Sequence, residues 1–193
     1  MTSRTVDQTV DARVKDLYMR YPYPSAEVDT GVALFGLLDY VRYVLWPGRA
    51  SLDGLRILDA GCGTGQVAVQ IARDYPHVRV VGIDISSASL EVARQRARAA
   101  GITDGERLSF RQASIEELAP DEQPFDYVIS WGVLHHLSDP VAGARQLTRL
   151  LAPTGGIGMM VYAPHGRHGV YVLQEALRRL MGERDLSEQV VVA

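Results

Sequence analysis

Three glycines mark the stretch of the chain best suited to hold a ligand. Gly61, Gly63 and Gly65 alternate with other residues in the segment 59–65 (DAGCGTG), which follows a short apolar run. Glycine tolerates positive φ and has no Cβ, so such a turn lets a ligand approach the backbone closely. The pattern predicts a ligand-binding turn between a strand and a helix.

The spacing of these glycines separates two kinds of ligand. A dinucleotide fingerprint would place its third glycine at position 66, where the chain has Gln66. With Asp59 closing the strand, the turn instead suits a ligand whose amino-acid end lies along it and whose ribose reaches the next strand. We therefore expect S-adenosylmethionine (SAM), with a nicotinamide or flavin dinucleotide as the disfavoured alternative.

Asp84 is the acidic residue placed to meet that ribose. It ends a β-branched run 19 residues after Gly65, and a carboxylate there can accept hydrogen bonds from both ribose hydroxyls. An aspartate in this place can also cap a helix or a turn, but the glycine turn before it favours the ligand. Cys62 is expected to be a small filler, because nothing near it in sequence would activate a thiolate.

The elements that position these residues follow from hydrophobic periodicity. Helix-like stretches separate the strand-like runs, which predicts a mostly parallel α/β sheet with helices on both faces. We expect strands at 57–59, 78–83, 108–112, 125–130 and 156–162. We expect helices after the glycine turn, after Ser86, from Asp139 to about Leu151, and from about Val170 to Gly182.

An aromatic-rich lead of about fifty residues precedes this alternation. Pro22 and Pro24 interrupt it, which predicts a short helix, a Tyr-Pro-Tyr-Pro turn and a second helix over 31–46. We expect residues 1–50 to form a helical lid and residues 51–193 to form a cofactor-binding domain that is incomplete at its C-terminal end.

Composition narrows the classes of function. The 193 residues carry a net charge of −3 with scattered arginines, which disfavours nucleic acid as a partner. The one cysteine rules out an intramolecular disulfide and favours the cytoplasm. The sequence contains neither a signal-peptide pattern nor a long apolar run, so we expect no membrane association.

The segments 57–65, 80–85, 125–137 and 150–156 resemble the successive motifs of class I SAM-dependent methyltransferases. The resemblance covers roughly residues 50–165. It implies a Rossmann-like sheet of strand order 3-2-1-4-5-7-6, with SAM as cofactor and S-adenosylhomocysteine (SAH) as product. The lead and the segment 165–171 also resemble a methyltransferase subgroup with a Tyr-Pro-Tyr-Pro N-terminal segment, which adds no known acceptor.

The resemblance also implies which residues contact the cofactor. The glycines would line the methionine part, Asp84 would bind the ribose and Ile85 would pack on the adenine. The family usually has an acidic residue after the third strand; Ser114 replaces it here, so we expect weaker adenine recognition. The full set of expected cofactor contacts is Asp59, Gly61, Gly63, Gly65, Asp84, Ile85, Ala113, Ser114, Ser130 and Trp131.

The candidates on the acceptor side are less specific. His135 is the candidate general base, because the resemblance places it toward the acceptor and an imidazole of pKa about 6.5 can take a proton. Capping of a turn is an equal alternative, and His136 is assigned to structure. Tyr21 and Tyr23 are candidate substrate contacts that close over SAM, with packing of a terminal helix as the alternative. We expect no metal.

We expect methyl transfer to a small-molecule acceptor, with a catalytically silent SAM-binding domain or a protein methyltransferase as alternatives. The chain has no sequence left for the last two strands of the family, so we expect a fragment of a longer protein. The fifth strand would then expose unpaired backbone groups, and we expect either a homodimer through that sheet edge or a cover from the lead.

Overall fold

The computed structural model describes residues 8–25, 37–103, 105, 107–119, 123–163 and 165–181. The features expected at 31–36, at Gly182 and at the C-terminal end lie outside these residues. The chain divides into two compact units, Met1–Val161 and Tyr162–Ala193. The expected boundary after residue 50 therefore stays a prediction.

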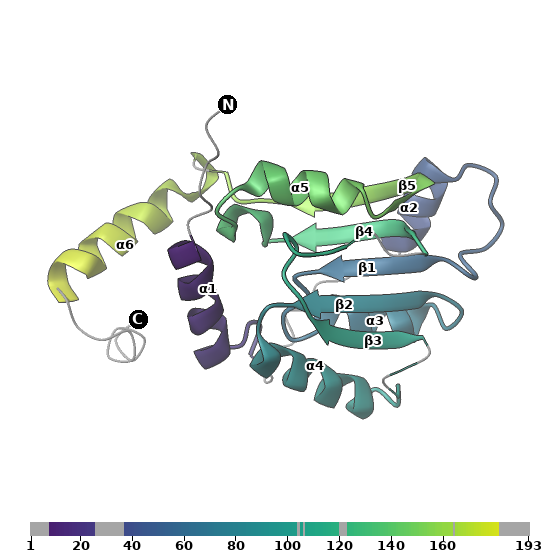
Figure 1. Cartoon of the computed structure of the whole chain (residues 1–193), viewed down its shortest axis with the longest axis horizontal. Coiled ribbons are helices and arrows are strands. Elements are labelled where there is room, and N and C mark those ends of the chain that lie inside the picture. The colour runs from purple at the N-terminus through teal and green to yellow at the C-terminus, as the bar shows by residue number, and fades with distance from the viewer. Residues whose placement is uncertain are drawn as a thin grey trace. The chain divides into compact units, whose positions relative to one another are not determined.

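The first unit contains a sheet of five parallel strands with helices on both faces (Figure 1). The strands lie in the order β3-β2-β1-β4-β5, which confirms the expected fold class for this sheet. Their bounds are β1 (Arg56–Ala60), β2 (Arg79–Asp84), β3 (Leu108–Gln112), β4 (Phe125–Trp131) and β5 (Leu151–Met160). All five carboxyl ends meet at one edge of the molecule.

Two helices of this unit, α4 (Ser87–Ala99) and α5 (Pro140–Thr148), begin after residues whose side chains satisfy free N–H groups of the first turn. Ser86 Oγ accepts a hydrogen bond from the N–H of Ser89 at 3.1 Å, and Asp139 Oδ1 accepts one from Ala142 at 3.0 Å. These caps fix the starts of two helices that follow strands. The helices are α1 (Gln8–Arg20), α2 (Leu37–Leu45), α3 (Gln66–Asp74), α4 (Ser87–Ala99), the 3₁₀ turn η1 (Leu134–His136) and α5 (Pro140–Thr148).

Alternating strand residues supply a core on each face of the sheet. Ile57 and Ile129 belong to a cluster with α2, α3 and α4, whereas Leu58 and Val128 belong to a cluster with η1 and α5. All four side chains are buried. A strand covered on both faces can bury consecutive apolar side chains, which explains the adjacent apolar pairs in β1 and β4.

The fifth strand differs most from its expected bounds. It starts at Leu151 and ends at Met160, whereas the sequence predicted 156–162, and α5 ends earlier than expected. The register shifts here, because Phe125 pairs with Leu151 while Tyr127 pairs with Gly156. Such an irregularity accommodates Pro153, which cannot donate to a regular ladder.

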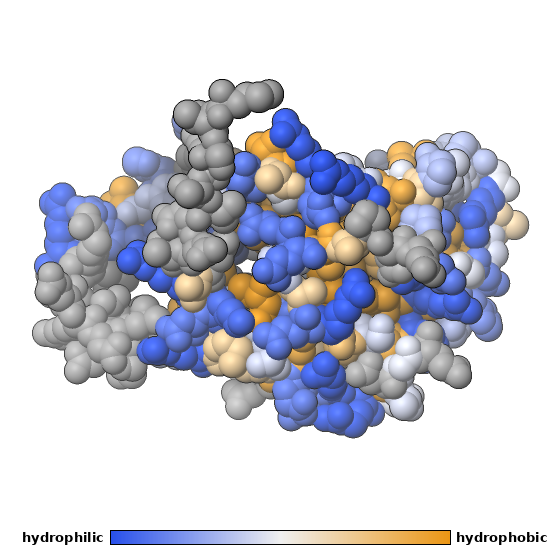
Figure 2. Space-filling view, viewed as in Figure 1, coloured by the Kyte–Doolittle hydropathy of each residue, from blue (hydrophilic) through white to orange (hydrophobic). Residues whose placement is uncertain are grey.

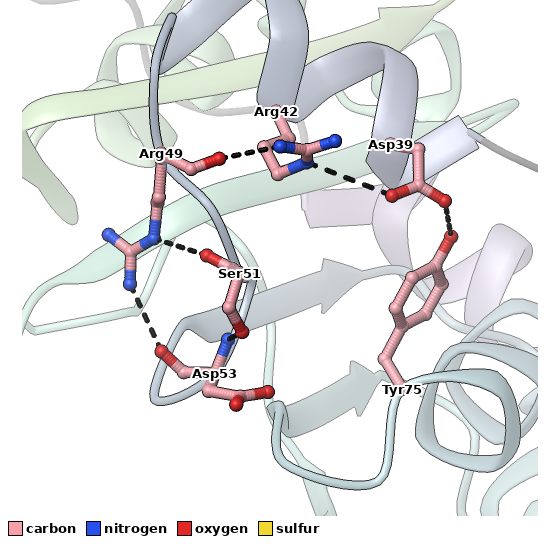
Figure 3. Close-up of polar contacts among 6 residues, drawn as sticks. All are labelled: Asp39, Arg42, Arg49, Ser51, Asp53 and Tyr75. Atoms are coloured by element: carbon pink, nitrogen blue, oxygen red, sulfur yellow. Dashed lines mark hydrogen bonds and ion pairs between the residues drawn. The ribbon is translucent and has the colours of Figure 1, made fainter.

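A polar network fastens α2 to the rest of the unit (Figure 3). The Tyr75 hydroxyl donates to Asp39 Oδ2 at 3.1 Å, and Arg42 Nε lies 3.8 Å from Asp39 Oδ1. Arg42 also donates to the carbonyl of Arg49 at 2.5 Å. Burial and the hydrogen bond to Asp39 raise the pKa of Tyr75 to about 12. The network therefore joins α2 to the residue that follows α3 and to the loop before β1.

The same part of the lead packs against β5. The Trp46 indole N–H donates to the carbonyl of Thr154 at 3.0 Å, and a Cβ added to Gly156 would lie 2.3 Å from Leu45 Cδ1. Within the described residues, β5 pairs with β4 and with no other strand. Its outer backbone edge is thus without a strand partner in the part of the chain that the structure describes.

The surface of the molecule that Figure 2 shows is mixed in hydropathy. Figure 2 shows hydrophilic and hydrophobic residues interspersed over the sheet-covering helices. Among the described residues, no helix is both long enough and apolar enough to cross a membrane.

The second unit is described by itself. It contains the 3₁₀ turn η2 (His165–Arg167) and α6 (His168–Met181). The Arg167 guanidinium lies 3.7 Å from the centre of the Tyr162 ring, a cation–π contact that ties the turn to the residue that begins the unit.

Candidate active site

The glycine turn follows β1 and has the conformation that the sequence predicted. Gly61 and Gly63 have φ of +82° and +52°, which residues with a Cβ rarely adopt. A Cβ at Gly61 would lie 2.4 Å from a methyl of Val133, and one at Gly63 would lie 2.4 Å from the Tyr23 carbonyl oxygen. The turn therefore needs glycine for two reasons: its backbone angles and the close approach of two other loops.

Asp84 stands opposite this turn at the end of β2. Its Oδ2 accepts the N–H of Gly63 at 2.9 Å, and its Oδ1 accepts the N–H of Ser86 at 2.8 Å. Burial raises the pKa of Asp84, while backbone hydrogen bonds from Ser86, Gly63 and Ile85 oppose that rise. Each carboxylate oxygen has a second lone pair, so both can still accept a ligand hydroxyl.

Asp59 is enclosed beneath the turn. Its side chain is buried, and its carboxylate accepts a hydrogen bond from the backbone N–H of Ala68 in the first turn of α3. Gly65, the N-cap of α3, has no side chain that could accept a hydrogen bond from this helix start. Burial and the charge of Asp84 raise the pKa of Asp59 to about 7. The structure thus shows Asp59 holding the helix start, and its contact with a cofactor stays a prediction.

A hollow of about 960 Å³ is lined by Ile85, the residue after Asp84, on the side where adenine was expected. This volume lies within the usual range for a small-molecule site. It brings together three predicted residues, Ile85, Ala113 and Ser114. The other lining residues are Ala12, Lys15, Gln112, Glu116, Glu117, Ala142, Arg145, Gln146 and Arg149.

Sequence reasoning missed the acidic groups of this hollow. Glu116 and Glu117 line it, two and three residues after the serine that replaces the acid of the family. The Ser114 hydroxyl oxygen accepts the N–H of Glu116 at 3.3 Å, so the loop turns tightly after β3. The adjacent glutamates in the sequence could have indicated this, because the tight turn after β3 places both of them on the wall of the hollow that Ser114 lines.

The end of β4 lies on the side of the site where the acceptor is expected. Ser130 is fully buried, and its Oγ has no hydrogen-bond partner among the described residues. Trp131 packs against the core cluster of the α2–α4 face, and the N–H of Gly132 donates to the carbonyl of Met160 at 2.8 Å. Ser130 and Trp131 therefore stand at the carboxyl edge beside the glycine turn, as expected.

Two histidines follow on η1. The ring centroids of His135 and His136 lie 4.2 Å apart, and both side chains are partly buried. His136 Nε2 lies 3.2 Å from the hydroxyl oxygen of Tyr18. Sequence reasoning did not select Tyr18, which lies 118 residues away from its partner.

The Tyr-Pro-Tyr-Pro segment meets the glycine turn through its backbone. Thr64 donates from its N–H to the carbonyl of Tyr23 at 3.3 Å and from its Oγ1 to the carbonyl of Pro24 at 2.8 Å. The Tyr23 side chain is 63% exposed, while Tyr21 is partly buried. The backbone of this segment, and not the Tyr23 ring, touches the cofactor loop.

Cys62 is a buried free thiol between two glycines of the turn. Burial and the charges of Asp59 and Asp84 raise the pKa of the Cys62 thiol well above its ordinary value, so it stays protonated. Within the described part of the chain, no group of three or more His, Cys, Asp or Glu could hold a metal ion.

Comparison with known proteins identifies the family of this chain. The sequence model described as "Methyltransferase domain" matches residues 51–184. An uncharacterised protein of Synechococcus sp. is 38% identical over 91% of this chain and 43% of its own length. A ubiquinone biosynthesis O-methyltransferase of Marinobacter nauticus is 33% identical over 80% of this chain and 62% of its own length. The chain thus spans about half the length of the curated relatives it matches.

A solved structure shows the same fold. It is a SAM-dependent methyltransferase from Thiobacillus denitrificans in complex with SAH, 21% identical, with a TM-score of 0.54 over 76% of this chain and 54% of that one. The match to the domain model covers more than half of the chain. The chain therefore belongs to the methyltransferase domain family.

Proposed function

We propose that this chain binds SAM at the carboxyl edge of the sheet and transfers its methyl group to a hydroxyl of a small molecule. The observation that carries the proposal is the position of Asp84, whose carboxylate faces the glycine turn at 2.9 Å from the N–H of Gly63. A ligand along the turn would meet that carboxylate with its ribose.

The residues present fit this cofactor. The buried Ser130 Oγ, which has no hydrogen-bond partner among the described residues, can bind the polar end of a ligand. The hollow at Ile85, Ala113 and Ser114 has room for an adenine. The glycine turn would hold the methionine part and Asp84 the ribose, while the carboxylate of Glu116 or Glu117 would supply the charged acceptor that Ser114 does not provide.

When bound, SAM supplies a methyl group on a positively charged sulfur, which leaves as the neutral thioether SAH. Because this leaving group is already activated, the protein has to align the acceptor and exclude water. His135 would take the proton of an acceptor hydroxyl as the oxygen bonds to the methyl carbon. The α1 helix would exclude water, since Ala12 and Lys15 border the hollow and Tyr18 reaches η1.

The acceptor class rests on the relatives. Several of them are named ubiquinone biosynthesis O-methyltransferases, one with 33% identity over 80% of this chain. Oxygen methylation of a small molecule is therefore our first choice of reaction. We also propose a cytoplasmic location, since the one cysteine is free and buried.

Production of SAH tests the proposal. The protein is incubated with SAM and separately with catechol, benzylamine and a lysine-containing peptide, and SAH is measured by mass spectrometry. We expect SAH with catechol, and less of it in Asp84→Ala at a limiting SAM concentration. If SAH forms with the peptide alone, the acceptor is a protein and not a small molecule. SAM binding without SAH from any acceptor would indicate a silent domain and contradict the proposal.

A further inference from the structure

Tyr18 is bound at both of its ends to loops of the active site. Its hydroxyl oxygen lies 3.2 Å from His136 Nε2, and its backbone carbonyl accepts the Ser86 hydroxyl at 2.9 Å. Ser86 follows Asp84 by two residues and binds it through its own N–H. Tyr18 therefore connects the loop after β2, which holds the predicted ribose ligand, to the turn after β4.

The contact with His136 has a defined geometry. The two rings lie edge to face, with centroids 5.9 Å apart and an interplanar angle of 74°. The His135 ring lies beside that of His136, with centroids 4.2 Å apart. Val133, just before this turn, is the residue that a Cβ on Gly61 would strike. The histidine pair thus lies next to the glycine turn. The contact with Tyr18 limits the rotation of the His136 ring.

We propose that Tyr18 is a positioning residue, which holds the His136 imidazole and through it the His135 ring toward the acceptor hydroxyl. The inference rests on the proposed methyl transfer and deepens it. The Tyr18 hydroxyl oxygen lies within hydrogen-bond distance of Nε2, so this contact favours one orientation of the His136 ring. A fixed imidazole orientation matters to a proton transfer that requires hydrogen-bond distance and alignment.

Tyr18→Phe tests the phenol alone. The variant keeps the backbone carbonyl that binds Ser86, and the hydrogen bonds of Thr64 to the following segment are also unchanged. The α1 helix should therefore remain docked. Tyr43→Phe is the matched control, because the Tyr43 side chain lies on α2 and is 77% exposed.

Two measurements read the role of Tyr18. Nitrogen NMR of the SAH-bound protein reports the tautomer of His136, and steady-state rates with SAM and catechol separate kcat from KM. We expect the His136 nitrogen shifts to move toward averaged values in Tyr18→Phe. We expect kcat to fall about tenfold while the KM for SAM stays within about twofold. Tyr43→Phe should match the wild type in both.

Each opposite result overturns the inference. Unchanged His136 shifts in Tyr18→Phe would show that the phenol does not hold the ring. A raised KM for SAM with an unchanged kcat would show that Tyr18 only fastens α1 over the cofactor. If the wild type forms no SAH with catechol, the proposed reaction fails, while the NMR comparison still decides whether Tyr18 positions the histidines. If Tyr18→Phe does not fold, an averaged His136 tautomer in the wild type contradicts the proposal.

Discussion

The N–H of Gly63 donates to Asp84 Oδ2 at 2.9 Å, so a hydrogen bond joins the glycine turn to the end of β2. Asp84→Ala removes this bond together with the expected acceptor for the ribose hydroxyls. Hydrogen bonds to a charged group contribute about 1.5 to 3 kcal/mol each, so SAH affinity should fall at least about tenfold. Isothermal titration calorimetry measures it.

Asp53→Ala is the control for this loss. Asp53 makes its recorded hydrogen bonds through its backbone N–H and carbonyl, and it lies on the loop before β1. Its replacement should leave SAH affinity unchanged. If Asp84→Ala binds SAH as the wild type does, the assignment of Asp84 to the ribose is wrong.

Gly63→Ala should displace the Tyr-Pro-Tyr-Pro segment. The new Cβ would lie 2.4 Å from the Tyr23 carbonyl oxygen, in addition to the strain of a positive φ. Gly101→Ala has the same kind of strain, with φ of +71°, but open space around the new Cβ. We expect trypsin to cleave after Arg20 faster in Gly63→Ala than in Gly101→Ala. Equal cleavage would show that the contact does not hold the segment.

Asp59 should make stability fall as the pH rises. Its pKa is raised to about 7 from 3.8, so the folded protein keeps a proton that the unfolded chain loses. The stability linked to this group is complete below pH 3.8 and is lost by about pH 7. The full change is about 4 kcal/mol. Urea denaturation of Asp59→Asn should show a smaller slope than the wild type, because the raised pKa of Asp84 also contributes to it, and Asp53→Asn should retain the wild-type slope. A wild-type curve that is flat or rising across this window would contradict the raised pKa.

The sequence predicted most of the sheet because β1, β2 and β4 each contain a short apolar run. β3 has its predicted bounds, and Asp84 ends β2 as expected. The start of β5 was hidden, because Pro153 normally excludes a regular strand and no pattern in the sequence announces a register shift. Hydrophobic periodicity in the sequence predicts regular strand pairing but does not predict a register shift.

The site was predictable where its residues follow strand ends and was missed where they come from the lead. The glycine turn and Asp84 lie in one βαβ unit, so their spacing in sequence translates into proximity. Tyr18 meets His136 only because α1 crosses the carboxyl edge of the sheet. The sequence indicated an aromatic lead but could not say that Tyr18 would reach the turn after β4.

Deletion of residues 1–24 should leave a folded domain with a more exposed cofactor. The deletion removes the hydrogen bonds of Ser86, Thr64 and His136 to the lead. Neither of the two core clusters of the sheet includes a residue of α1, so both clusters are retained. We expect SAH to dissociate about tenfold faster, since lids of this kind gate exchange. Stopped-flow fluorescence measures the rate. Cooperative unfolding of the truncated protein at a much lower temperature would show that the segment is core packing instead of a lid.

The edge of β5 should cause the chain to associate with a second copy. The strand carries no charged residue; Met159 near its end is 50% exposed, and Val161 just after it is 53% exposed. An uncharged strand edge with unpaired N–H and C=O groups is a template for pairing. We expect light scattering to show a dimer at high protein concentration, and Met159→Lys to weaken it at least about tenfold, because the charge must be desolvated between the strands. Val141→Lys, on the exposed side of α5, should dimerise as the wild type does. A wild type that remains monomeric at every concentration would show that the lead, through contacts such as Trp46 with Thr154, already covers the edge.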